Sequence, residues 1–268
     1  MGVHLSSLDG QVLVALRDYA VPAALGVARL VSCFAWLPYL GAGALPSRML
    51  RVGLALVVLM GIWPVSADLQ RPDGLLGLAL AALTEAMIGT ALGLMLALPY
   101  HVFHAIGSII DTQRGAGVGA ILDPLSGVEA TELANLLQMF SAVVFLAAGG
   151  LVPLMIAVHG SYALLPMGAA FMPELTHIHS FVDLVLSAAV RMAAPVLLLL
   201  LLVEILLGVL SRFAQQLNAF SVSLSVKTLL AFLAMLFYFM QSMAEQVPAL
   251  WHLYPSLRVL PEWGGASE

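Results

Sequence analysis

The chain has 268 residues, of which 62% are hydrophobic and only 9% are charged, and its formal net charge is −5. Soluble proteins are typically about 45–50% apolar and about 25% charged, so this composition excludes an ordinary soluble enzyme and a disordered chain. The net negative charge argues against a nucleic-acid partner, which requires clustered Lys and Arg. The sequence therefore predicts an integral membrane protein.

Six apolar segments approach or exceed the ~20 residues that a spanning helix needs. In chain order they cover residues 19–40, 52–66, 75–110, 133–158, 181–210 and 229–240. We expect the third to break around Pro99 and the fourth at Gly149-Gly150 and Pro153. The sixth is too short to span a membrane unless residues 222–226 and Met243 extend it. No segment alternates apolar and polar residues as a barrel strand does, so the predicted fold class is all-α, built from long apolar helical hairpins.

The chain is expected to form one membrane domain over residues 1–268. Three parts of it stand out by composition, namely an N-terminal segment 1–14, a glycine-rich loop 107–132 and a polar C-terminal tail 246–268. No 20–50-residue repeat is evident.

The Arg and Lys residues of the short loops should indicate orientation, because such residues favour the cytoplasmic side. Loops that join successive spanning segments alternate between the two sides of the membrane, and here both sides hold positive charge. The residues concerned are Arg48, Arg51, Arg71, Arg114, Arg212 and Lys227. Either some segments do not cross the membrane, or assembly with partners overrides the rule.

Four charged residues lie inside apolar segments: Arg29, Glu85, Arg191 and Glu204. An unpaired charge in hydrocarbon is costly, so these groups should face protein, water or one another. One interpretation is a secondary transporter that binds a small solute through Glu85, Arg191 and Glu204. We favour structural pairing inside an assembly, because no polar stripe accompanies the charges and no inverted repeat is visible.

Glu85, Gly89 and Gly93 recur every four residues and therefore share one helix face. The two glycines form a small-xxx-small surface that suits close helix contact. A carboxylate beside such a surface predicts a buried helix–helix contact rather than exposure to lipid.

Enzyme motifs are absent: the chain contains no H-E-x-x-H, G-x-S-x-G or Walker A sequence. His101 and His104 are i,i+3 neighbours on a helix, and His177 and His179 flank Ile178 in an expected loop. Either pair could hold a metal with a carboxylate such as Asp111 or Glu174. Two histidines without a settled third ligand are more often interfacial or capping residues. We therefore expect no enzyme activity, no metal and no cofactor.

The first informative stretch is the glycine-rich loop, in which tight non-helical backbone is expected. Such backbone between spans is tolerated only where it is buried in protein or lines a water-filled cavity, so an apolar loop of this kind could close a pore by excluding water. The alternative is a plain connecting loop with a turn at Asp123-Pro124. The candidate gate or plug residues are Gly107, Asp111, Gln113, Arg114, Gly115, Gly117, Gly119, Asp123, Pro124 and Gly127.

The second informative stretch covers residues 204–227, where an apolar helix gives way to an amide-rich patch and then to a serine-spaced apolar segment. Gln and Asn side chains there offer donors and acceptors to a neighbouring backbone. The alternative is an interfacial loop with snorkelling Arg and Lys. Together with the face at Glu85, the candidate packing or partner residues are Glu85, Gly89, Gly93, Arg191, Glu204, Ser211, Arg212, Gln216, Asn218, Phe220 and Lys227.

At these two stretches the chain resembles a known family. The run from Asp111 through Gln113 and Arg114 to Gly115, followed by Asp123-Pro124 and Gly127, resembles the central motif of the T component of the type III secretion export apparatus, the YscT/HrcT/SpaR family. Residues 204–227 are similar to that family's C-terminal signature, and the resemblance spans about residues 15–245. The flagellar relative FliR shares the outline.

The resemblance implies a subunit of the export gate in the bacterial inner membrane, within the type III secretion basal body. Its expected partners are the R-type and S-type subunits (FliP-like and FliQ-like), the U-type switch protein (FlhB-like), membrane lipid and the secreted effector and needle polypeptides. The family is similar to a fusion of its R-type and S-type partners and joins them in a spiral complex that forms the portal for secreted proteins. In this comparison the glycine-rich loop corresponds to the plug.

Overall fold

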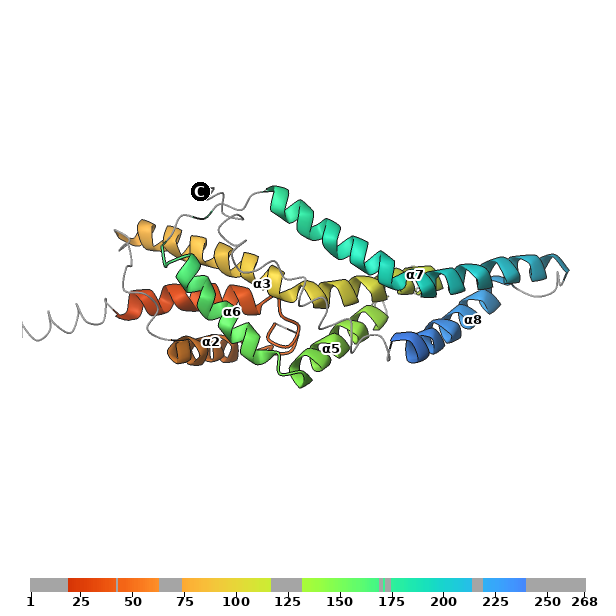
Figure 1. Ribbon diagram of the computed structural model, residues 1–268, viewed down its shortest axis with the longest axis horizontal. Helices are drawn as coiled ribbons and strands as arrows, with labels where there is room; N and C mark the ends of the chain where they lie inside the picture. The colour runs from red at the N-terminus through yellow and green to blue at the C-terminus, as the bar shows by residue number, and fades with distance from the viewer. Residues whose placement is uncertain are drawn as a thin grey trace, which may run out of the picture. The chain divides into compact units, whose positions relative to one another are not determined.

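The computed structural model describes residues 19–41, 43–62, 74–116, 132–168, 171, 175–213 and 219–239, and every regular element within these ranges is helical. The elements are the helix Tyr19–Phe34, α2 (Arg48–Ile62), α3 (Gly74–Arg114), α5 (Glu132–Ala147), α6 (Leu151–Leu164), α7 (Leu175–Phe213) and α8 (Ala219–Ala234), which continues as the π-helical turn η1 (Met235–Phe239) (Figure 1). The all-α prediction is confirmed.

Three of these helices are long and apolar enough to cross a membrane: Gly74–Arg114, Ile178–Phe213 and Val222–Phe239. A fourth span results if α5 and α6 are counted together as one broken crossing. The extension of the sixth segment back to Val222 is confirmed, whereas Met243 lies outside the described residues.

The chain divides into two compact units. Unit 1 comprises Met1–Ala97, Leu151–Ile178 and Tyr254–Glu268, and unit 2 comprises Leu98–Gly150 and His179–Leu253. The chain passes from one unit to the other within α3 between Ala97 and Leu98, between α5 and α6 after Gly150, and within α7 between Ile178 and His179.

In unit 1, the helix Tyr19–Phe34 lies beside α2, α6 and the N-terminal part of α3 (Figure 1). The predicted small-residue face of α3 makes this contact: a Cβ added to Gly89 would collide with the Arg29 carbonyl oxygen, and one added to Gly93 would come within 2.6 Å of the Cys33 carbonyl oxygen. The predicted buried helix–helix contact is confirmed. The helix that Gly89 and Gly93 contact belongs to the same chain, so of the packing and partner roles considered for these two residues the structure supports packing within the chain.

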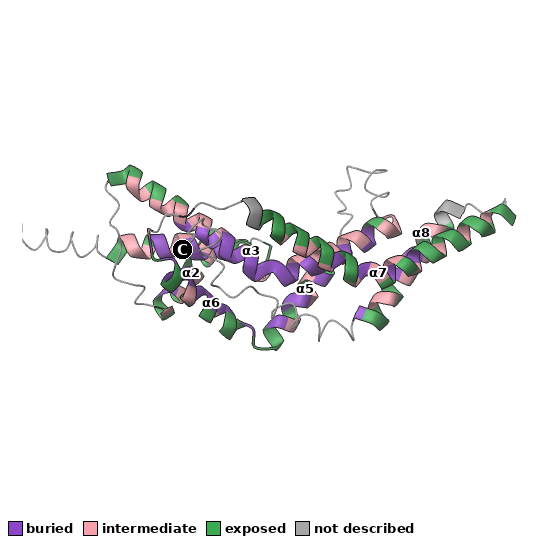
Figure 2. Ribbon diagram, turned by 45° about the horizontal axis from the view of Figure 1, so that its top comes forward, coloured by how far each residue is buried: buried purple, intermediate pink, exposed green. Residues whose placement is uncertain are grey.

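In unit 2, the C-terminal part of α3 packs against the start of α5. A Cβ added to Gly107 would collide with the backbone of Ala134, and the nearest atom would be Ala134 Cα. Figure 2 shows buried residues concentrated in the middle of α3, whereas much of α7 is exposed. The exposed positions of α7 are mainly Leu, Val and Ile, as expected for helices covered by lipid or by other subunits.

Glycines end two of the helices. Gly115 at the end of α3 (φ 86°) and Gly149 at the end of α5 (φ 78°) adopt the left-handed conformation that residues with a Cβ disfavour. At α3, Gly115 N–H donates to the Thr112 carbonyl and Ala116 N–H to the Asp111 carbonyl, the two bonds of a Schellman motif. The interruption predicted at Gly149-Gly150 is confirmed, and Pro153 lies in the first turn of α6, where a missing N–H costs nothing.

Several predicted boundaries are wrong because helices extend further than the apolar runs. α3 continues through Pro99, which removes a single i→i−4 hydrogen bond, while the neighbouring Leu98 and Tyr100 are buried and hold the helix. Arg48 and Arg51 lie within α2 rather than in a loop. His177 and His179 lie in the first turns of α7 rather than in a loop.

The tight contact at Gly89 predicts opposite effects for two Gly→Ala substitutions. Gly53 on α2 is exposed and an added Cβ would meet nothing, so Gly53→Ala should stabilise the chain by up to about 1 kcal/mol through helix propensity. Gly89→Ala should destabilise it by about 1–3 kcal/mol, because the neighbouring backbone has to move. Thermal unfolding of the purified full chain in mild detergent measures both. Equal stability of the two variants would contradict the packing described.

Candidate functional site

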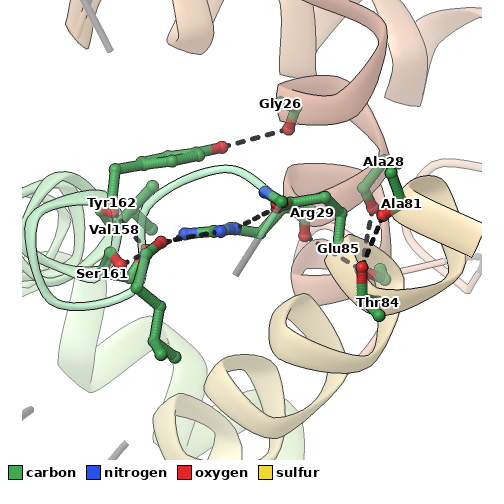
Figure 3. A network of polar contacts seen from close by, with 12 residues as sticks. Gly26, Ala28, Arg29, Ala81, Thr84, Glu85, Val158, Ser161 and Tyr162 are labelled. Atoms are coloured by element: carbon green, nitrogen blue, oxygen red, sulfur yellow. Dashed lines mark hydrogen bonds and ion pairs between the residues drawn. The ribbon is translucent and has the colours of Figure 1, made fainter. Parts of the chain in front are cut away.

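The first polar cluster is a fully buried ion pair in unit 1. Arg29 Nε donates to Glu85 Oε2 at 2.6 Å, and neither side chain is exposed to solvent. Figure 3 shows the Arg29 side chain extending from its own helix between Glu85 on α3 and the C-terminal part of α6. Two charges removed from water are stable only when their remaining donors and acceptors are also bonded, which the surrounding groups provide here.

The other N–H groups of Arg29 close the C-terminal end of α6. Arg29 Nη1 donates to the Ser161 carbonyl at 3.1 Å and Nη2 to the Leu165 carbonyl at 2.9 Å. The last carbonyls of a helix have no partner within the helix, and the cation also complements the negative end of the helix dipole. Arg29 therefore fixes the end of α6 to the Tyr19–Phe34 helix.

Glu85 is likewise fully bonded, since its second oxygen, Oε1, accepts the Gly168 N–H at 3.0 Å. Gly168 has a φ of 83°, a left-handed conformation that directs this N–H into the site and that a residue with a Cβ would disfavour. The carboxylate thus binds one cation through Oε2 and one neutral donor through Oε1.

Tyr162 completes this cluster, which we call the Arg29 cluster. Its ring lies over the guanidinium, 4.3 Å from Arg29 Cζ, and its hydroxyl donates to the Gly26 carbonyl at 3.1 Å. Of the two interpretations of Arg29 and Glu85, the structure supports structural pairing. Glu85 is buried inside its own chain, so of the packing and partner roles considered for it the structure supports packing within the chain.

The second polar cluster, the Asp111 cluster, lies in unit 2 where α3 ends and α5 begins. Asp111 Oδ1 accepts from Arg114 Nε at 2.8 Å and forms an ion pair with Arg114 Nη2 at 2.7 Å. Asp111 Oδ2 accepts the N–H groups of Leu133 at 3.0 Å and Ala134 at 3.4 Å. These two N–H groups belong to the first turn of α5, which has no partners for them within the helix. Asp111 thus caps α5 from another helix, and its negative charge suits the positive helix end.

The Asp111 cluster holds together the two ends of the glycine-rich loop. The prediction of non-helical backbone from residue 107 is wrong for its first part: Gly107, Asp111, Gln113 and Arg114 all belong to α3. Gly115 starts the loop, and Leu133 lies just beyond its other end. The remaining predicted plug residues, Gly117, Gly119, Asp123, Pro124 and Gly127, lie outside the described residues.

A third pair joins α7 and α8. Lys227 Nζ lies 3.0 Å from Glu204 Oε2; the Lys227 side chain is 9% exposed, whereas that of Glu204 is 52% exposed. The pairing of Glu204 with Lys227 could not be read from the sequence, because 23 positions separate them. Arg191 is exposed on α7 and is not brought together with either residue.

The rest of the second candidate stretch is only partly described. Ser211 and Arg212 belong to the last turn of α7, and Phe220 belongs to α8. Gln216 and Asn218 lie outside the described residues.

No group of three or more His, Cys, Asp or Glu side chains in the described part of the chain is arranged to hold a metal ion. His101 and His104 are on α3, and the His101 ring contacts the Phe181 ring edge-on at a centroid distance of 6.4 Å. His101 and His104 therefore do not assemble with Asp111 into a metal centre within the described residues, and Glu174 lies outside them.

The groups that complete these clusters could not be read from the sequence. Backbone carbonyls and amides, such as those of Ser161, Leu165 and Gly168, carry no sequence signal. Tyr162 and Phe232, whose ring lies 5.6 Å from Arg114 Cζ, could have been suspected only as aromatic partners for buried cations.

Comparison with known proteins places these features in a family. Residues 20–253 match the family model described as "Bacterial export proteins, family 1". The chain is 41% identical to the surface presentation of antigens protein SpaR of Salmonella typhimurium, over 87% of this chain and 88% of that protein. It is 29% identical to the Yop proteins translocation protein T of Yersinia pestis, over 83% and 87% of the two chains. It is 27% identical to the flagellar biosynthetic protein FliR of Escherichia coli, over 72% and 74%.

The Arg29 cluster predicts that the destabilisation caused by substituting Arg29 and Glu85 together is smaller than the sum of the two single effects. Arg29→Met leaves Glu85 buried and unpaired and should destabilise the chain by about 3–5 kcal/mol. Arg29→Lys should recover only part of this loss, because lysine cannot reach Glu85, Ser161 and Leu165 with a planar fork of donors. Arg29→Met combined with Glu85→Leu should be clearly more stable than Arg29→Met alone, since no buried charge remains. Chemical unfolding in detergent micelles measures all three variants, and a double variant as unstable as the sum of its singles would contradict this account.

Proposed function

The chain belongs to the bacterial export proteins of family 1, and we propose that it forms part of the portal and plug of a type III secretion export gate. It is a membrane-embedded component of the type III secretion export apparatus, as its similarity to SpaR and to the Yop translocation protein T indicates. We propose further that it lies in the bacterial inner membrane, within the basal body, where secreted effector and needle polypeptides enter the channel. We assign it no catalytic step of its own.

The observation that carries the plug assignment is the Asp111 cluster. One carboxylate binds the cation at the end of α3 and two amides at the start of α5, so both ends of the glycine-rich loop are anchored to one point. A loop that has to block a channel needs a base that stays in place while its apolar residues exclude water. Gly107 adds to this base, because its lack of a side chain lets α3 and α5 approach closely.

Partner subunits are proposed from the exposed apolar faces. Leu, Val and Ile side chains along α7 and Met, Leu and Val side chains on α2 are exposed in the isolated chain. Faces of this kind require lipid or other protein to cover them. R-type and S-type subunits, which are FliP-like and FliQ-like, and the FlhB-like U-type switch protein are the proposed occupants, with membrane lipid at the periphery.

The small-solute transporter is not supported. The relatives are named for antigen presentation, Yop translocation and flagellar biosynthesis. In addition, both oxygens of Glu85 are bonded within the chain, and Glu204 is paired with Lys227. Within unit 2, Arg191 is not brought together with Glu204.

The assembly proposal predicts what accompanies the chain in purification. The tagged full chain, extracted from its native membrane in mild detergent, should be recovered in a stable particle with at least two other small apolar proteins identified by mass spectrometry. Recovery of the chain alone, as a monomer or a homo-oligomer, would overturn the proposed function.

The plug proposal predicts an ion leak when the loop or its base is damaged. Deleting residues 115–119 should depolarise cells that express the whole apparatus, as measured with a potential-sensitive dye. Cells with Asp111→Ala should also leak ions, because α5 loses its cap. Asp111→Asn keeps an oxygen acceptor for the Leu133 and Ala134 amides, so cells with this variant should leak less. A tight membrane with the deletion variant, in cells where the apparatus still assembles, would count against the plug.

A further inference from the structure

The sequence contains the pattern Glu-x-x-x-Gly on two apolar helices, at Glu85 and Gly89 on α3 and at Glu204 and Gly208 on α7. In both, carboxylate and glycine lie one turn apart on the same helix face. At the first, the face is occupied: the helix Tyr19–Phe34 lies in the space above Gly89 and supplies Arg29 to Glu85. The first pattern therefore shows, within this chain, what such a face accommodates.

At the second pattern the face is open. A Cβ added to Gly208 would meet nothing within 4 Å, so the glycine forms a notch in the surface of α7. The neighbouring Leu201 and Ile205 are 46% and 55% exposed. Glu204, between them, has a half-exposed side chain although it lies on an apolar spanning helix. A carboxylate left in contact with hydrocarbon is costly, so something other than lipid chains has to cover it.

The bonding of the two carboxylates shows what is missing. Glu85 binds a cation through Oε2 and a neutral N–H donor through Oε1. Glu204 binds the Lys227 ammonium through Oε2, and its Oε1 has no partner among the described residues. The pair is already electrically neutral, so a second cation would leave an uncompensated charge in an apolar setting. The missing group is a neutral hydrogen-bond donor.

We propose that the α7 face formed by Glu204 and Gly208 binds an apolar spanning helix of another export-apparatus subunit, which packs into the Gly208 notch and donates a hydroxyl or carboxamide hydrogen bond to Glu204 Oε1. This inference rests on the proposed function, because it requires an assembly with other subunits. It goes further by naming the face and the chemistry of the helix that covers it. Exposed leucine and isoleucine around Glu204 favour a helix as occupant over a water-lined channel wall, which would be polar.

Filling the notch tests the proposal. Gly208→Leu, in the tagged full chain expressed with the whole apparatus, should lower the recovery of at least one other subunit by about fivefold or more, because overpacking a tight helix contact typically costs about 1–3 kcal/mol. Val209→Leu is the matched control: it adds bulk at a 53%-exposed position roughly 140° around the helix from Glu204 and should leave recovery unchanged.

Folding and assembly are separated by a second measurement. Gly208→Leu should leave the thermal unfolding of the isolated chain unchanged or slightly raised, because the added side chain meets no atom of its own chain and leucine is the better helix former. Unchanged recovery of every subunit with Gly208→Leu would overturn the inference. If the unsubstituted chain brings no other subunit with it, the proposed function itself fails.

A photo-crosslinking residue at Leu201 identifies the occupant. The expected adduct joins the chain to a spanning helix of another subunit that carries Ser, Thr, Asn or Gln near the crosslink. Replacing that donor with an apolar residue should weaken assembly with the unsubstituted chain but not with a chain carrying Glu204→Leu and Lys227→Met, which has no carboxylate to satisfy. Adducts with lipid alone, or with a secreted polypeptide, would overturn the proposal.

Discussion

A guanidinium inside an apolar chain is tolerated only if hydrogen-bond acceptors compensate its burial, and Arg29 gains one acceptor for each of its three nitrogens by bringing three helices together. Its Nε reaches Glu85 on α3, while its two terminal nitrogens reach carbonyls at the end of α6. The geometry of unit 1 follows from this demand. α3 has to approach the Tyr19–Phe34 helix closely enough for the ion pair to form, and only glycine at positions 89 and 93 leaves the space for that approach.

The same requirement shapes unit 2 around a carboxylate. Asp111 stands where α3 ends and where the first turn of α5 leaves two amides without partners. One charged oxygen accepts from both amides and the other holds Arg114, so both oxygens of Asp111 are bonded. Helix ends are the places where an apolar protein has unpaired backbone, and in both units a charged side chain from a different helix supplies the missing partner. These charges serve as caps.

The helices were predictable from the sequence because apolar length is a strong signal in a membrane protein, and the face of Glu85, Gly89 and Gly93 was predictable from its spacing of four. The continuity of α3 through Pro99 was not, since it depends on burial of the neighbouring Leu98 and Tyr100, which only the folded chain provides. The partners of Arg29 and Asp111 were equally hidden, because most of them are backbone groups distant in sequence. Local pattern therefore indicated which charges matter but not what they bind.

The failure of the positive-inside rule has a physical explanation in the same clusters. The rule concerns Arg and Lys in short loops, yet Arg48 and Arg51 lie in α2, Arg114 and Arg212 in the last turns of α3 and α7, and Lys227 within α8. Arg114 and Lys227 are further engaged by carboxylates of the same chain. A cation that is held at a helix end or paired between helices stabilises tertiary contacts and is not available to mark a cytoplasmic loop. At Arg114 and Lys227, positive charge therefore reports on pairing within the chain, and the Arg and Lys residues between the apolar segments do not indicate an orientation.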